Sequence, residues 1–214
     1  LGSSVMGYIM PATVHLETEE NRGINANLMW LIDGMVKCAN YARTKKIPYL
    51  GLCLGMQIMV IEYSRNVLNL NDANSTEFDQ KSNNPVIDFL PGQMKLKETG
   101  ASMRLGNYPC VIKKNSKVFD CYKESEIIER HRHRYEVNNE YKDKLEKEGL
   151  VPTGTSPDGN LVEIMEVVDH PFMIGSQFHP EFLSRPDRPH PLFYGFVSAV
   201  NETVVEGDQI RLIQ

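Results

Sequence analysis

The chain has 214 residues, which suits one α/β domain with a full hydrophobic core. It carries 23 Lys and Arg against 28 Asp and Glu, a formal net charge of -5, so its charge gives no reason to expect nucleic acid as a partner. The four cysteines form no C-x-x-C pair, which indicates neither a zinc site nor a disulfide framework and fits a reducing, cytoplasmic setting. We find no run of about 18 apolar residues and no secretory signal pattern, and therefore expect no membrane span.

The N-terminal half of the chain predicts a helix, a strand and a second helix. Residues 1–31 give the weakest indication of secondary structure in the chain. An amphipathic helix is expected over residues 33–46, with Asp33 as its N-cap and cations near its C-terminal end. The apolar run at 47–52 predicts a buried parallel strand, and a helix-compatible run follows at 56–67. This order is typical of a doubly wound α/β fold with a mostly parallel central sheet flanked by helices.

The turn between that strand and the second helix carries the first chemical signal. It is Gly51-Leu52-Cys53-Leu54-Gly55, a cysteine framed by glycines. A residue on a sharp strand-to-helix turn stands above the sheet edge, as in a nucleophile elbow, and the helix N-terminus favours a thiolate there. The alternative is a buried core cysteine, which is the commoner role of a cysteine in general. The Gly-x-Cys-x-Gly frame favours the nucleophile.

Beyond the second helix, the sequence alternates between polar segments and short strands. Residues 71–91 are polar and rich in turn formers, and we expect a long loop near the Cys53 edge of the sheet. Asp158-Gly159 is a hairpin signal between two strands. The other expected elements are strands over 103–112, 127–137, near 151, 161–168 and 172–178, a charged surface helix over 140–148, a closing helix over 192–205 and a tail over 206–214.

The segment Glu129–Asn138 raises the question of a metal or RNA site. His131 and His133 share one face of the expected strand, as two metal ligands would. No further ligand cluster accompanies them, so we expect no metal site. The basic residues between Glu129 and Glu136 are too few to indicate an RNA-binding strip.

A second chemical centre follows the last apolar strand, at His179-Pro180-Glu181. A cysteine on an elbow, together with a histidine oriented by a carboxylate, can transfer an acyl group through a thioester. Cys53 would attack an amide or ester carbonyl, His179 would protonate the leaving group, and Glu181 would orient His179. The backbone N–H of Leu54 is placed to donate to the oxyanion.

These two centres resemble the class I glutamine amidotransferases, whose signature is Gly51–Gln57 with His179–Glu181. Further segments look like the glutaminase domains of CTP synthases, and the match runs from about residue 32 to about residue 200. The resemblance implies one flavodoxin-like domain over residues 1–214. The specific segments are NDANSTEFD at 71–79, MRLG at 103–106, ERHRHRYEVN at 129–138 and QFHPEFLSRP at 177–186.

The resemblance also implies a reaction and its partners. L-glutamine would be hydrolysed to glutamate and ammonia without a cofactor in this domain. The ammonia would pass to a synthetase domain of the same polypeptide, which uses ATP and Mg²⁺ to convert UTP to CTP and through which the whole enzyme forms a homo-oligomer. The implied catalytic residues are Cys53, His179 and Glu181, and the implied glutamine-binding residues are Leu54, Gly55, Met56, Gln57, Glu77 (for the α-ammonium) and Arg134.

One departure from the family leaves alternatives open. The family's glycine-rich Pro-Gly-Gly-Phe-Gly-x-Arg-Gly loop, which supplies the second oxyanion donor, has only a faint echo at residues 21–24. Three explanations stay open: residues missing from this sequence, which we favour, an oxyanion hole built differently, or an impaired site. An impaired site would make the chain a regulatory or assembly module without activity, which is one rival function. The other rival is a glutaminase that serves another synthetase, such as those that make GMP or anthranilate, and the segments STEF at 75–78 and RHRHRYEVN at 130–138 argue against it.

Overall fold

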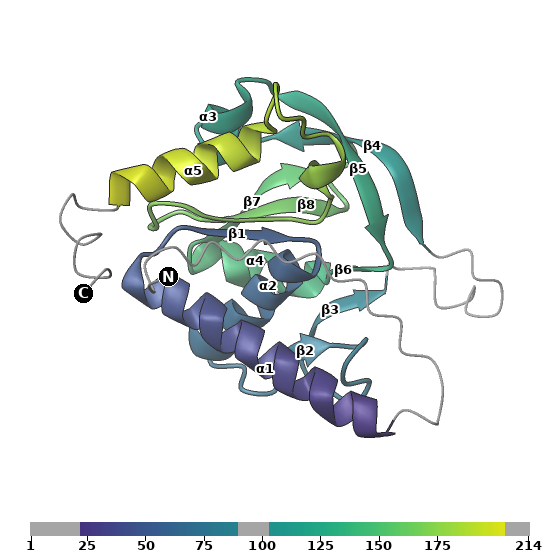
Figure 1. Ribbon diagram of the computed structural model, residues 1–214. Helices are drawn as coiled ribbons and strands as arrows, with labels where there is room; N and C mark the ends of the chain where they lie inside the picture. The colour runs from purple at the N-terminus through teal and green to yellow at the C-terminus, as the bar shows by residue number, and fades with distance from the viewer. Residues whose placement is uncertain (1–21, 90–102, 204–214) are drawn as a thin grey trace.

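The structure is a computed structural model that describes residues 22–89 and 103–203 (Figure 1). The expected tail over 206–214 and most of the segment 1–31, for which the sequence predicts no clear element, lie outside the described residues. The elements are α1 Arg22–Lys45, β1 Tyr49–Leu52, α2 Leu54–Asn66, β2 Asn74–Ser75, β3 Pro85–Phe89, β4 Arg104–Ile112, α3 Lys117–Tyr122, β5 Glu126–His133, β6 Tyr135–Val137, α4 Asn139–Lys147, β7 Leu150–Thr155, β8 Val162–Val167, β9 Met173–Ser176, a 3-10 turn Pro180–Phe182 and α5 Pro191–Thr203.

The central sheet is mixed, in the order β1-β9-β8-β7-β4-β5. Strands β1 and β9 pair in parallel, whereas the other four described pairings of this sheet are antiparallel. The expectation of a mostly parallel sheet is therefore not confirmed. The physical reason is the short connections: the Asp158-Gly159 turn joins β7 to β8 as a hairpin, as predicted, and a tight turn joins β8 to β9.

Two expected elements belong partly to a second, smaller sheet in the order β2-β3-β6. The segment 71–91, expected as a loop, contains β2 and β3, which pair in parallel. The strand expected over 127–137 is divided at Arg134, where the chain leaves β5 in the large sheet and enters β6 in the small one. Residue Arg134 therefore lies where the two sheets meet.

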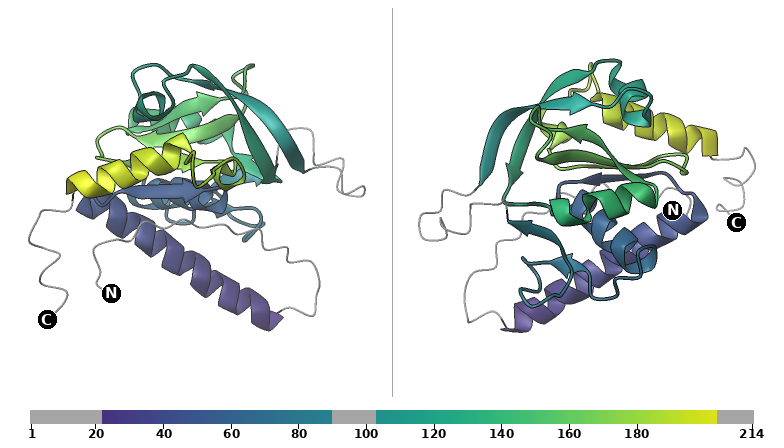
Figure 2. Two further views of the ribbon diagram at one scale, coloured as in Figure 1. Left: turned by 45° about the horizontal axis from the view of Figure 1, so that its top comes forward. Right: turned by 180° about the vertical axis from the view of Figure 1, so that it is seen from behind.

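Helices cover both faces of the large sheet, as Figures 1 and 2 show. Helices α1, α2 and α4 pack on one face around a core that includes Met56, Ile61 and Leu145, and α3 and α5 pack on the other around Phe172 and Phe196. Burial of apolar side chains on both faces is what an α/β sheet requires. No helix in the described ranges is long and apolar enough to cross a membrane.

Helix α1 begins at Arg22, so it is longer than the predicted helix over 33–46. Asp33 is inside this helix and does not cap it. The N-cap prediction was wrong because residues 24–32, directly before Asp33, contain no proline or glycine that would keep the helix from extending over them. Ile32, Met35 and Ala39 are buried in the core, which anchors this face of the helix.

Candidate active site

Cys53 lies on a sharp turn between β1 and α2, as the sequence predicts. Its backbone has φ 50 and ψ -102, a conformation that is costly for a residue with a side chain and that is typical of functional turns. A Cβ on Gly51 would lie 2.6 Å from the backbone carbonyl carbon of Gly55, so the turn needs glycine at this position. The Cys53 N–H donates to the carbonyl of Ser176 at 2.7 Å, which fixes the turn against β9.

His179 lies next to this turn because β1 and β9 are neighbouring parallel strands. Leu52 is paired with Ser176, so Cys53 and the residues after Ser176 leave the sheet at the same edge. The backbone N–H of His179 donates to the carbonyl of Arg130 at 2.8 Å. Pro180 then begins a 3-10 turn, which folds Glu181 back toward the imidazole.

The side chains of His179 and Glu181 form a short ion pair. Nδ1 of His179 lies 2.7 Å from Oε1 of Glu181. Burial lowers the pKa of His179, but the interactions of its imidazole with Cys53 and Glu181 outweigh this effect and raise the pKa to about 10. Desolvation raises the pKa of Glu181, but the hydrogen bond from His179 outweighs it, so the net shift is downward. The pair is therefore charged at neutral pH.

The other nitrogen of His179, Nε2, is buried and makes no hydrogen bond of normal geometry with a described residue. Cys53 is nevertheless close enough to raise the pKa of this imidazole. The structure thus brings together all three residues for which the sequence predicts catalysis, and Nε2 is the nitrogen left for proton transfer.

Residues 54–57 form the first turn of α2, and all four are buried. A Cβ on Gly175 would lie 2.6 Å from Met56 Cγ, so the Met56 side chain packs on β9. Gln57 donates through Nε2 to the carbonyl of Tyr135 at 3.1 Å. The side chains of Met56 and Gln57 are thus engaged inside the protein, and their backbone N–H groups donate to the carbonyl of Cys53 at 3.1 and 3.3 Å. The backbone N–H groups of Leu54 and Gly55 are therefore the donors of this helix start that remain for a ligand.

Glu77 and Arg134, expected to contact glutamine, interact with each other. Glu77 follows β2 and is exposed, while its backbone N–H donates to Ser75 Oγ at 3.2 Å. Desolvation raises the pKa of Glu77 to about 7, and the positive charge of Arg134 opposes this shift. Strand β2 runs parallel to β3, and β3 runs antiparallel to β6, so the end of β2 before Glu77 and the start of β6 after Arg134 lie at the same edge of the small sheet.

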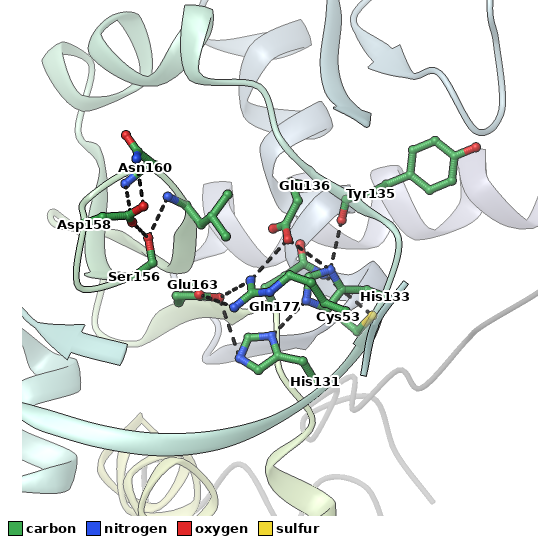
Figure 3. A network of polar contacts seen from close by, with 12 residues as sticks. Cys53, His131, His133, Tyr135, Glu136, Ser156, Asp158, Asn160, Glu163 and Gln177 are labelled. Atoms are coloured by element: carbon green, nitrogen blue, oxygen red, sulfur yellow. Dashed lines mark hydrogen bonds and ion pairs between the residues drawn. The ribbon is translucent and has the colours of Figure 1, made fainter. Parts of the chain in front are cut away.

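A buried polar cluster lies behind Cys53 (Figure 3). Arg104 donates through Nη2 to Glu163 Oε1 at 2.9 Å and through Nη1 to Glu136 Oε1 at 3.2 Å. Neither Arg104 nor Glu163 was predicted from the sequence as part of a polar cluster. Their only signal was a charged residue within an expected strand, which does not identify its partner.

His131 and His133 belong to this cluster and bond to each other, Nδ1 to Nε2, at 2.8 Å. Burial, with the positive charge of Arg104, lowers the pKa of His131 to about 2 and that of His133 to about 3, so both rings are neutral. Within residues 22–89 and 103–203, no group of three or more His, Cys, Asp or Glu side chains has the arrangement of a metal site. The expectation of no metal site stays a prediction for the whole chain.

Comparisons with known proteins agree in pointing to one family. The profile described as "Glutamine amidotransferase class-I" matches residues 21–199. A CTP synthase of Dehalococcoides mccartyi is 57% identical over 181 residues, which cover 85% of this chain and 33% of that protein. A CTP synthase of Rubrobacter xylanophilus is 59% identical over 168 residues, which cover 78% of this chain and 30% of that protein.

Among solved structures, the glutaminase domain of Trypanosoma brucei CTPS with bound acivicin superposes with a TM-score of 0.76 at 39% identity. The match covers 82% of this chain and 68% of that one. The chain thus spans about a third of the length of the curated relatives that it matches, and it matches most of the solved domain.

Proposed function

Because the chain belongs to the class I glutamine amidotransferases, and within them to the glutaminase domains of CTP synthases, we propose that Cys53, His179 and Glu181 are the residues that hydrolyse glutamine. The observation that carries this assignment is the meeting of the strained Cys53 turn with the His179–Glu181 ion pair at one sheet edge. Family membership supports the reaction, and the geometry supports the role of each residue.

In the first half of the proposed reaction, Cys53 Sγ attacks the side-chain carbonyl carbon of glutamine. Nε2 of His179 gives its proton to the amide nitrogen as the C–N bond breaks, and ammonia leaves. The product is a thioester between Cys53 and the glutamate side chain. The developing oxyanion accepts a hydrogen bond from the backbone N–H of Leu54, and one such donor typically lowers the barrier by about 3 kcal/mol.

In the second half, water attacks the thioester carbonyl. The neutral imidazole of His179 accepts a proton from that water, and the C–S bond then breaks to release glutamate and Cys53. Glu181 holds the imidazole through Nδ1 in both halves, which keeps Nε2 directed at the reacting atoms and stabilises the charged ring.

We assign the recognition of free glutamine to residues 54–57, Glu77 and Arg134. The backbone at the start of α2 offers N–H donors, the carboxylate of Glu77 suits the α-ammonium, and the guanidinium of Arg134 suits the α-carboxylate. A site that pairs with both charges of a free amino acid discriminates against a glutamine side chain within a protein.

The partners of this domain belong to the same proposal. The curated relatives are about three times as long as the matched segment, which supports a linked synthetase domain that receives the ammonia. ATP and Mg²⁺ would act there, in the conversion of UTP to CTP, and that domain would carry the homo-oligomer contacts. We place the whole enzyme in the cytoplasm, with neither nucleic acid nor membrane as a partner.

A second candidate function, a regulatory or assembly module without activity, is favoured by one observation. The family's glycine-rich oxyanion loop has only a faint echo in the sequence, at residues 21–24, and Arg22 in that segment is already the first residue of α1. Glutamate release that depends on Cys53 would exclude this candidate.

The test is chemical modification with a glutamine-like electrophile, followed by peptide mapping. We expect modification at Cys53 and protection by L-glutamine, with Cys53→Ala as the control that removes both the label and glutamate release. Modification at the half-exposed Cys38 instead, or glutamate release that survives Cys53→Ala, would contradict the assignment.

A further inference from the structure

Besides His179, a second side chain reaches the sulfur of Cys53. Gln177 comes directly after β9, is fully buried, and donates through Nε2 to Cys53 Sγ at 3.7 Å (Figure 3). This distance is within the range of a hydrogen bond to sulfur, whose atomic radius is larger than that of oxygen. The backbone N–H of Gln177 donates to the carbonyl of Glu163 at 2.8 Å, which ties the position of this residue to β8.

The orientation of the Gln177 amide follows from its neighbours. Gln57 Nε2 lies 3.1 Å from the carbonyl oxygen of Tyr135, and a carbonyl can only accept a hydrogen bond. The nitrogen of Gln57 is therefore the end that faces Tyr135, and its second hydrogen points to Gln177 Oε1 at 3.3 Å. Since Gln177 must present its oxygen to Gln57, it presents its NH₂ group to the sulfur.

A neutral donor at this place has a specific chemical use. A thiolate accepts a hydrogen bond more strongly than a thiol does, so the N–H of Gln177 favours the nucleophilic form. It does so without adding a second positive charge next to His179, whose imidazole must give up its proton to the leaving nitrogen. It also restrains the sulfur from one side while His179 acts from another.

We propose that Gln177 binds the Cys53 thiolate and orients its sulfur, and that Gln57 is a positioning residue that fixes the Gln177 amide. This inference rests on the proposed function and deepens it, because it names a second side chain, besides that of His179, that contacts the reacting sulfur. It also gives Gln57 a role through its side chain that differs from the backbone contacts assigned to residues 54–57.

The test measures how fast iodoacetamide alkylates Cys53 in the full chain between about pH 5 and pH 10, because the rate follows the thiolate fraction. Gln177→Met keeps the volume of the side chain and removes the donor. Gln177→Glu keeps its shape and replaces the donor by an acceptor. The matched control is Ser176→Ala, one residue earlier in β9, whose hydroxyl donates to Phe178 and not to Cys53.

We expect the pH midpoint of Cys53 alkylation to rise by about one unit in Gln177→Met, because the thiolate loses one hydrogen bond. Below the midpoint, this shift corresponds to an alkylation rate that is roughly tenfold lower. The rise should be larger in Gln177→Glu and absent in Ser176→Ala. Gln57→Leu should move the midpoint in the same direction by a smaller amount, because the Gln177 amide can then rotate.

A folded Gln177→Met with the wild-type profile would overturn the inference and leave the proposed function intact. If Gln177→Met does not fold, Gln57→Leu decides, and an unchanged profile there has the same meaning. In contrast, a wild-type Cys53 that is alkylated no faster than Cys38 would overturn the proposed function, and this inference with it. Peptide mapping separates the two cysteines.

Discussion

Replacing Glu181 by Gln tests the electrostatics of the candidate site most directly. Glu181→Gln keeps a hydrogen-bond acceptor near His179 Nδ1 but removes the negative charge that lies 2.7 Å away. A hydrogen bond between charged groups contributes about 1.5 to 3 kcal/mol. The Glu181 side chain is 32% exposed, so solvent screens it and the lower end of that range applies.

The expected consequences follow from that energy. About 1.5 kcal/mol corresponds to a fall of about one unit in the pKa of His179, because one unit is 1.36 kcal/mol. Since His179 acts as acid in one half-reaction and base in the other, we expect glutamine hydrolysis to slow by about 10- to 100-fold. The pKa of His179 is measured by NMR titration of the imidazole nitrogens, and the rate by glutamate release.

The same ion pair should appear in the stability of the fold. The pKa of His179 is raised from 6.5 to about 10, so its contribution is complete below pH 6.5 and is lost as the pH rises through 10. The pKa of Glu181 is lowered from 4.5, so its contribution is lost as the pH falls below that value. The difference in unfolding free energy between wild type and Glu181→Gln should therefore be greatest between about pH 4.5 and pH 6.5, and it should fall as the pH rises toward 10.

The chain offers a matched control in a second buried pair, Glu129 and His190, whose Oε1 and Nε2 lie 2.8 Å apart. Glu129→Gln should lower stability and leave the titration of His179 unchanged. These expectations are refuted if Glu181→Gln folds normally and neither the His179 titration nor the rate of hydrolysis moves.

Three further predictions concern the turn, the substrate and the other thiols. Gly51→Ala should destabilise the fold by about 3 kcal/mol or more in urea unfolding, because its Cβ meets backbone at 2.6 Å, while Gly34→Ala in the open face of α1 should be neutral or stabilising. The pKa of Glu77 is raised to about 7, so its carboxylate is protonated below that pH and can no longer pair with the α-ammonium of glutamine. Calorimetry in a Cys53→Ala background should therefore show glutamine binding that weakens as the pH falls. Glu77→Gln should weaken binding about fivefold and remove this pH dependence. Burial raises the pKa of Cys110 far above its usual range, so iodoacetamide should leave it unmodified while Cys53 is fully alkylated, and labelling of Cys110 in the folded chain would contradict this.

The sequence predicted the parts of the site that are encoded locally. The glycine frame of Cys53 allows only a tight strand-to-helix crossing, and the His179-Pro180-Glu181 string places a carboxylate within one short turn of the imidazole. Both are consequences of backbone geometry over a few residues. The meeting of the two centres needed one long-range fact, the parallel pairing of β1 with β9, which no local pattern predicted and which the structure shows.

The direction of the other strands could not be derived in the same way. An apolar strand buried on both faces has the same residue pattern whether its neighbours run parallel or antiparallel. The difference lies in the connections, and only the Asp158-Gly159 turn carried a recognisable signal. The division of the strand expected over 127–137 at Arg134 had no local signal, because both halves keep strand-forming residues.

The charged residues of β5 mark a limit of local inference. Alternation along β5 puts His131 and His133 on the buried side. The pattern therefore shows that these polar groups are buried, but it does not identify their hydrogen-bond partners. The answer is a cross-strand pairing of Arg104 with His133 and an ion pair from Arg104 to Glu163, which is 59 residues away in the sequence. Such a cluster is costly to bury unless nearly every member is paired, so its presence behind Cys53 requires the neighbouring strands to keep one register. We therefore attribute to it the fixed position of the strand ends that carry the candidate site.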